Sequence, residues 1–198
     1  MPLPHPGTMP KLVLASASPR RREILAAAGI PYTVRRAPVS EERHRGEPPE
    51  EFVRRLAWAK ATAVELEAAD EIILAADTEV VIDGLTLGKP ADPADASRML
   101  ALLSGREHEV ITGVCLRHAA GAVVDLERTR VRFVSLTAEE IAAYVATGEP
   151  LDKAGAYAIQ GRACRFIDRI EGCYFNVVGL PVALVYRHLK RLAPGGWR

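Results

Sequence analysis

Residues 12–23 read LVLASASPRRRE and pass from an apolar run into a strongly basic segment. The first four residues have the continuous hydrophobicity of a buried strand in a parallel sheet. Ser18 is a favourable N-cap and Pro19 suits the first position of a helix, which we expect to span Arg20 to Ala28 and to stop at Gly29. The stretch therefore predicts a buried strand that leads directly into the N-terminus of a helix, as in α/β proteins.

Three consecutive arginines, residues 20–22, occupy the first turn of this expected helix. Cations at this end oppose the helix dipole, so the helix itself gains nothing from them. An anion held jointly by free backbone N–H groups and guanidinium groups would explain their position. The alternative is a charged helix start that is simply solvated. The segment alone leaves phosphate binding and solvated surface both open.

Composition bounds the class of protein. The 198 residues suffice for one sizeable domain or for two small lobes that share a cleft. Hydrophobic residues make up 48% and charged residues 26%, which predicts a globular protein with a core. The formal net charge of +1 gives no case for a nucleic-acid or membrane surface. We therefore expect neither of these partners.

The two ends of the chain predict the domain boundaries, and the cysteines predict the cellular compartment. We expect residues 1–10 to be a loose leader, because they lack the apolar core of a signal peptide. Residues 11–193 would form one domain, and residues 194–198 a tail. Cys115, Cys164 and Cys173 lack C-x-x-C spacing, which argues against a zinc knuckle or a disulfide framework. Free thiols of this kind favour a reducing cytoplasm.

Lys60 stands in an unexpected position. A helix is predicted from Pro49 to about Ala69, and Lys60 falls on its apolar stripe, four residues after Leu56. Either the side chain snorkels at the edge of the stripe, or its ammonium group reaches into a cleft. The spacing favours neither alternative.

Two further charged residues follow predicted strands or turns. The apolar run Glu71–Ala76 predicts a second buried strand that ends at Asp77 and Thr78, which places Asp77 where α/β sheets bind their ligands. The next segment predicts a hairpin that turns at Asp83–Gly84. Lys89 then lies in a loop between a glycine and a proline, next to the strand that leads to Asp77.

The later part of the chain contains an unusual loop. Residues 107–136 read as β-rich, and a capping box at Thr137–Glu140 opens another helix. The loop that follows, Glu149–Gly161, combines two glycines, a tyrosine and the adjacent opposite charges Asp152 and Lys153. Such a composition is unusual for a simple connector, although Asp152 and Lys153 could merely pair with each other.

Several of these motifs together resemble the Maf family of nucleoside triphosphate pyrophosphatases, also called septum-formation inhibitors. Each motif alone is weak, but their order and spacing from Leu12 to His188 are specific. The late loop resembles the branch of the family that acts on dTTP and UTP, with Ala158 where relatives often have glycine. The matching positions are Ala15–Arg21, Glu41, Lys60, Ala76–Thr78, Gly88–Pro90, Asp152–Gly161 and Val178–Pro181.

The resemblance implies a mixed α/β sheet with two lobes flanking a central cleft, similar to inosine triphosphate pyrophosphatases, and a homodimer. It implies hydrolysis of dTTP and UTP, with CTP a further candidate, to the monophosphate and pyrophosphate, which sanitises the nucleotide pool. A divalent cation, Mg²⁺ or Mn²⁺, would assist.

The resemblance also assigns roles. Asp77 would be the general base. Thr78, Gln160 and Arg20 would set specificity, although a strand-end hydroxyl and a loop amide are the plain alternatives for Thr78 and Gln160. Glu41, otherwise a solvated loop residue, and Asp77 would hold the metal. The phosphate ligands would be Ser16, Arg20, Arg21, Lys60 and Lys89.

Three rival functions share parts of this evidence. A nucleotide-binding regulator of cell division would need the phosphate site but no base. The same chemistry could act on a modified purine nucleotide such as 7-methyl-GTP. An RNA-binding module would need a basic face with exposed stacking rings, which the near-neutral charge disfavours.

Overall fold

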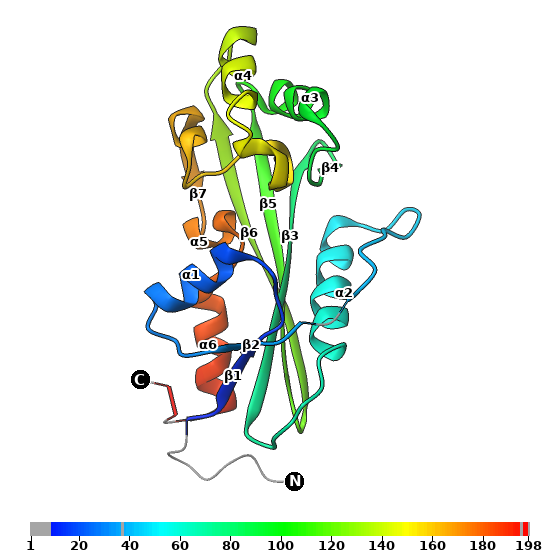
Figure 1. Ribbon diagram of the computed structural model, residues 1–198, viewed down its shortest axis with the longest axis vertical. Helices are drawn as coiled ribbons and strands as arrows, with labels where there is room; N and C mark the ends of the chain where they lie inside the picture. Colours follow the sequence, from blue (N-terminus) through cyan, green and yellow to red (C-terminus); the bar gives the residue numbers. More distant parts are fainter. Residues whose placement is uncertain (1–8, 37, 195, 198) are drawn as a thin grey trace. The chain divides into compact units, whose positions relative to one another are not determined.

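The computed structural model describes residues 9–36, 38–194, 196 and 197 (Figure 1). Most of the predicted leader, residues 1–8, and residues 195 and 198 of the predicted tail lie outside this range. The chain divides into two compact units. Unit 1 comprises Met1–Asp77, Thr112–Glu127 and Gly179–Arg198, and unit 2 comprises Thr78–Ile111 and Arg128–Val178.

The described residues form a seven-stranded sheet in the order β2-β1-β3-β5-β6-β7, with β4 paired to β3 off this path. β1 pairs in parallel with β2 and β3, whereas β4 is antiparallel to β3 and β7 to β6. This mixed sheet confirms the expected α/β class. The strands are β1 (Lys11–Leu14), β2 (Thr33–Val34), β3 (Glu71–Ile82), β4 (Leu85–Leu87), β5 (Glu107–His118), β6 (Gly121–Phe133) and β7 (Ile167–Glu171).

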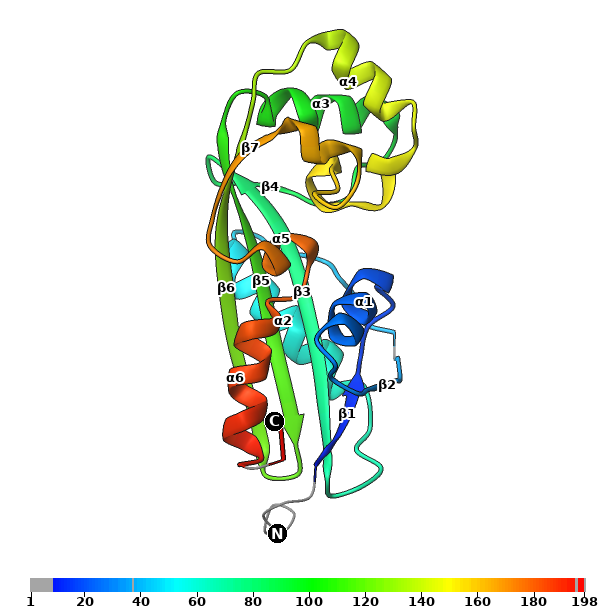
Figure 2. The same cartoon turned by 90° about the vertical axis from the view of Figure 1, so that its left-hand side faces the viewer.

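Unit 1 packs helices on both faces of its part of the sheet. Figures 1 and 2 show α2 (Pro49–Thr62) on one face, and α1 (Pro19–Ala27) and α6 (Val182–Leu192) on the other. The β1 residues are almost wholly apolar because both faces of the strand are covered. The α2 face is closed by a cluster of small side chains and aliphatics, namely Val13, Ala15, Ala57, Ala61, Val64, Ile73, Ala75 and Cys115.

The helix α2 ends at Thr62, so the predicted extension to Ala69 is wrong. Arg117 on β5 explains the end. Its Nε donates to the carbonyl of Ala61 at 3.0 Å, and its Nη2 donates to the carbonyl of Val64. A guanidinium group that satisfies the last carbonyls replaces a further helical turn. Val64 is buried through its packing in the core cluster and not through helical periodicity.

Strand β3 continues through Asp77 to Ile82, so the prediction that the strand ends at Asp77 is wrong. Its second half pairs with β4, which gives the backbone groups beyond Asp77 their hydrogen-bond partners. The hairpin itself is confirmed: Asp83 and Gly84 both have positive φ, 48° and 76°. A two-residue turn with two positive φ angles matches the twist of the flanking strands.

Unit 2 carries α3 (Pro93–Leu103), α4 (Ala138–Val145) and α5 (Tyr174–Val178), with α3 and α4 side by side in both views (Figures 1 and 2). The predicted capping box is present, since Thr137 and Glu140 each bond the backbone N–H of the other. The predicted loop 149–161 folds largely into the 3-10 turns η1 (Glu149–Asp152) and η2 (Ala154–Ala156), and η3 (Arg162–Phe166) follows it.

No helix among the described residues combines the length and apolar character that crossing a membrane requires.

Candidate active site

The start of α1 holds its arginine and serine together. Ser16 Oγ accepts hydrogen bonds from Arg21 Nη1 at 3.1 Å and from the backbone N–H of Ser18 at 3.2 Å. Arg21 Nε donates to the carbonyl of Gly179 at 2.8 Å. Ser18 occupies the predicted N-cap position, but its hydroxyl makes no capping bond. These contacts bring Ser16 and the guanidinium group of Arg21 together at the N-terminal end of α1, the end of a helix at which anions bind favourably.

Arg21 is a buried cation, with only 9% of its surface exposed. Burial lowers the pKa of its guanidinium group, and the neighbouring carboxylate of Asp77 acts in the opposite direction. The positive charge of Arg20 also lowers the pKa of Arg21, whereas the negative charge of Glu41 raises it. The buried arginine thus belongs to the same electrostatic cluster as the two carboxylates.

Lys60 lies between two carboxylates. Its Nζ is 2.7 Å from Asp77 Oδ1 and 2.6 Å from Glu41 Oε1. The Lys60 side chain is 16% exposed and that of Asp77 11%, whereas that of Glu41 is 60% exposed. Of the two alternatives left open by the sequence, the structure therefore supports a lysine directed into a polar cluster. A snorkelling side chain would instead keep its ammonium group in water.

Asp77 has the electrostatics of a poised base. Burial raises the pKa of its carboxyl above the ordinary value, while Lys60 and Arg21 oppose the rise and Glu41 adds to it. A strongly perturbed carboxyl beside named charge partners is typical of functional sites. Such a group accepts a proton more readily than an ordinary aspartate.

The segment that carries Glu41 is anchored by an ion pair that sequence reasoning did not find. Arg55 Nε and Nη2 bind Glu47 Oε1 and Oε2 at 2.6 and 2.8 Å, and Nη2 also donates to the carbonyl of Glu42 at 2.9 Å. His44 is exposed, and its backbone N–H donates to Glu47 Oε2 at 3.1 Å. This bidentate pair ties the Glu41 segment to α2, the helix that also carries Lys60.

Three predicted site residues belong to unit 2. Thr78 follows Asp77 along β3 and is half-buried, whereas Lys89 and Gln160 are exposed. The Lys89 loop is tied to the later turns, because the carbonyl of Gly88 accepts from the N–H of Gly155 at 3.0 Å. Gly155 has φ of 68°, and a Cβ there would lie 2.9 Å from the Val80 side chain, so any other residue would be strained at this position.

The structure therefore brings two groups of predicted residues together within unit 1. Arg21 binds Ser16, and Lys60 bridges Glu41 and Asp77. Arg20 is half-buried in the first turn of α1.

The carboxylates of Glu41 and Asp77 fit a divalent cation. Mg²⁺ is usually bound by one or two carboxylates together with substrate phosphates and water. Both carboxylates already converge on one cation, the ammonium group of Lys60. Within the described part of the chain, no cluster of three or more His, Cys, Asp or Glu residues could hold a metal. Two carboxylates thus suit a cation whose other ligands come from water or a bound anion.

Comparison with known proteins decides the family. A family model described as Maf-like protein matches residues 11–192. The chain belongs to the Maf family. The predicted resemblance is thereby confirmed, and the match covers almost all of the predicted single domain.

Curated Maf relatives are similar over nearly the whole chain. A protein of Moorella thermoacetica named dTTP/UTP pyrophosphatase is 55% identical over 191 residues, which cover 96% of this chain and 98% of that protein. A protein of Koribacter versatilis with the same name is 52% identical, covering 91% and 93% of the two chains.

A solved structure of low sequence identity shares the fold of this Maf protein. The Ham1 protein of Staphylococcus aureus is 16% identical, with a TM-score of 0.52 over 91% of this chain and 98% of the other. At this identity the likeness concerns the α/β fold alone.

Proposed function

We propose that this Maf protein hydrolyses dTTP and UTP, with CTP a further candidate, to the nucleoside monophosphate and pyrophosphate. The observation that carries the proposal is the buried Asp77 carboxyl in contact with Lys60, which also binds Glu41. The relatives named dTTP/UTP pyrophosphatase support the choice of substrate. Hydrolysis of a phosphoric anhydride needs neutralised phosphate oxygens, an aligned water and a stabilised leaving group.

The triphosphate is held by cations and by the start of α1. Ser16, Arg20 and Arg21 bind phosphate oxygens together with the N–H groups of the first helical turn. Lys60 and Lys89 add positive charge, which stabilises the negative charge on the leaving pyrophosphate.

Asp77 acts as the general base. It takes a proton from water, whose oxygen attacks the α-phosphorus as the bond to the bridging oxygen of the pyrophosphate breaks. Lys60 holds the carboxylate in its ionised, proton-accepting form and fixes its orientation. When bound by Glu41 and Asp77, a divalent cation such as Mg²⁺ or Mn²⁺ supplies charge for the triphosphate and makes the attacking water more acidic.

Thr78 and Gln160 select the base, and Arg20 contributes to specificity. A hydroxyl and an amide each offer a donor and an acceptor, which matches the alternating edge of uracil or thymine. A site that hydrogen-bonds polar groups rejects bases that leave those groups unpaired.

The biological task that we propose is sanitation of the nucleotide pool in the cytoplasm. The three cysteines are free thiols, which suits a reducing compartment. Assembly as a homodimer stays a prediction, which sedimentation analysis of the purified chain tests.

The decisive experiment is a nucleotide panel. Pyrophosphate release is measured for dTTP, UTP, CTP, GTP and 7-methyl-GTP, each with Mg²⁺, with Mn²⁺ and with EDTA. We expect metal-dependent release that is fastest with dTTP or UTP. Tight binding of UTP without pyrophosphate release would favour the regulator instead, and preference for 7-methyl-GTP would transfer the same chemistry to modified purines.

A further inference from the structure

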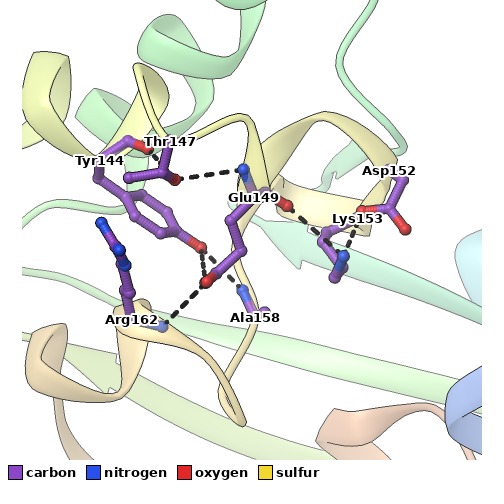
Figure 3. A network of polar contacts seen from close by, with 7 residues as sticks. All are labelled: Tyr144, Thr147, Glu149, Asp152, Lys153, Ala158 and Arg162. Atoms are coloured by element: carbon purple, nitrogen blue, oxygen red, sulfur yellow. Dashed lines mark hydrogen bonds and ion pairs between the residues drawn. The ribbon is translucent and has the colours of Figure 1, made fainter.

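The turn that carries Gln160 is held from both sides. Two residues before it, the backbone N–H of Ala158 donates to the hydroxyl of Tyr144 at 3.1 Å. Two residues after it, the N–H of Arg162 donates to Glu149 Oε1 and Oε2 at 2.9 and 3.2 Å. Figure 3 shows these side chains converging on the turn from α4 and η1.

The two anchors are joined to each other. The Tyr144 hydroxyl donates to Glu149 Oε1 at 2.8 Å, so this one carboxylate oxygen accepts from both Tyr144 and Arg162 (Figure 3). Tyr144 is fully buried, and its ring meets Phe166 edge-on with centroids 5.4 Å apart. Burial and the bond to Glu149 raise the pKa of the Tyr144 hydroxyl, which therefore keeps its proton and remains a donor.

Gly161 shows how closely the carboxylate approaches the turn. A Cβ at this position would lie 2.3 Å from Glu149 Oε1, so the carboxylate would have to move away from the turn. The glycine next to Gln160 thus leaves the space that the Glu149 carboxylate fills. The N–H of Gly161 also closes the turn by donating to the carbonyl of Ala158 at 3.0 Å.

Gln160 itself differs from its neighbours. Its side chain is exposed, and its amide makes no hydrogen bond to another residue in the part of the chain that the structure describes. A fixed backbone with a free amide is the arrangement that recognition of a ligand by hydrogen bonds requires, because little ordering remains to be done on binding.

We propose that Glu149, supported by Tyr144, is a positioning residue that sets the preference for pyrimidine nucleotides by fixing the turn around Gln160. The inference rests on the proposed role of Gln160 in reading the base. Glu149 acts through the backbone N–H of Arg162 and has no contact with substrate in this account.

The test compares Glu149→Ala with Glu149→Gln. The ratio of kcat/KM for UTP to that for GTP is measured for each variant. We expect Glu149→Ala to lower the ratio by about tenfold, mainly through KM for UTP, because a misplaced recognition group weakens binding and leaves Asp77 in place. Glu149→Gln should keep most of the ratio, since a single oxygen can accept from both Tyr144 and Arg162.

A second background and a control variant separate positioning from a general structural role. In a Gln160→Ala background, whose own ratio is expected to be flattened, Glu149→Ala should lower the ratio no further. Glu139→Ala removes an exposed carboxylate of α4 and should leave the ratio unchanged. If Glu149→Ala fails to fold, Tyr144→Phe takes its place, since it removes one anchor and keeps the buried ring.

If folded Glu149→Ala keeps the wild-type ratio of kcat/KM for UTP to that for GTP, the proposal is overturned. It is also overturned if Glu149→Ala lowers this ratio as much in the Gln160→Ala background as in the wild type. An unchanged ratio in Gln160→Ala alone would overturn it as well. The same ratio is also measured as dissociation constants for UTP and GTP in EDTA, which needs no turnover. If the wild-type chain prefers UTP in binding but releases no pyrophosphate, hydrolysis is refuted, while the binding ratios of the variants still decide the role of Glu149.

Discussion

Lys60 Nζ lies 2.7 Å from Asp77 Oδ1, although the two residues are 17 positions apart and lie on a helix and a strand. The ammonium group compensates the carboxylate of a side chain that is only 11% exposed. Without this partner, the free-energy cost of removing the carboxylate from water would raise the pKa of Asp77 further and favour its protonated form. The contact therefore keeps a buried aspartate available as a base.

Asp77→Asn should abolish turnover and leave the fold intact. An amide has nearly the shape of the carboxylate but accepts no proton, so we expect kcat to fall by about 10²–10⁴-fold. Pyrophosphate release with saturating UTP measures the loss, and circular dichroism checks the fold. Asp83→Asn, an exchange of the same kind in the exposed β3–β4 turn, is the control. Near-normal release by Asp77→Asn would remove Asp77 from the mechanism.

Lys60→Met should move the acidic limb of the pH–rate profile. The pKa of Asp77 is raised by burial and held down by Lys60, so loss of the lysine raises it further. A base works only when ionised, hence activity falls as the pH drops through this pKa. We expect the limb of kcat/KM to move to higher pH by about one unit.

Carbon NMR of the Asp77 carboxyl in the metal-free protein gives the same pKa independently of turnover. Lys190→Met, on the exposed face of α6, should leave both measurements unchanged. If the acidic limb of the kcat/KM profile does not move in Lys60→Met, Lys60 does not control the pKa of Asp77.

Glu47→Gln should destabilise the protein more at neutral pH than in acid. Arg55 and the His44 N–H outweigh burial and lower the pKa of Glu47 from 4.5 to about 2. Because the folded pKa is depressed, this stabilisation is complete above the ordinary pKa of 4.5 and is lost as the pH falls toward the folded value of about 2. We expect the free energy of unfolding at pH 7 to fall by about 1–2 kcal/mol, since water partly screens the pair.

Urea unfolding of the wild type and the variant at pH 7 and near pH 3 measures this difference. Glu65→Gln, which changes an exposed carboxylate of unit 1, is the matched control and should behave like the wild type. A destabilisation of equal size at both pH values would rule out the ionised pair as its cause.

Gly113→Ala should destabilise unit 1. A Cβ at Gly113 would lie 2.4 Å from the carbonyl oxygen of Val53, so β5 and α2 would have to move apart. Overpacking against backbone predicts a loss of about 2–3 kcal/mol in the free energy of unfolding. Gly88→Ala, where an added Cβ meets nothing within 4 Å, is the control in the same urea experiment. Equal stability of the two variants would contradict the close approach of β5 to α2.

Local signals in the sequence were sufficient for several elements. The apolar run and Ser18–Pro19 predicted β1 and the start of α1, and Asp83–Gly84 predicted the β3–β4 hairpin. The capping box at Thr137–Glu140 was predicted with both of its bonds. In each case the residues that form the structure lie within a few positions of one another, so the local sequence is enough to predict the element.

The sequence by itself determined the α/β class, these local turns and caps, and the motifs by which the chain is similar to Maf proteins. Only the tertiary structure decided that α2 ends at Thr62, where Arg117 binds its last carbonyls, that β3 passes through Asp77, and that Lys60 bridges Asp77 and Glu41. The anchoring of the Gln160 turn by Glu149 could not be predicted from the sequence either. The physical reason is that such contacts join groups far apart in the chain, and packing and desolvation select them only when the elements fold against one another.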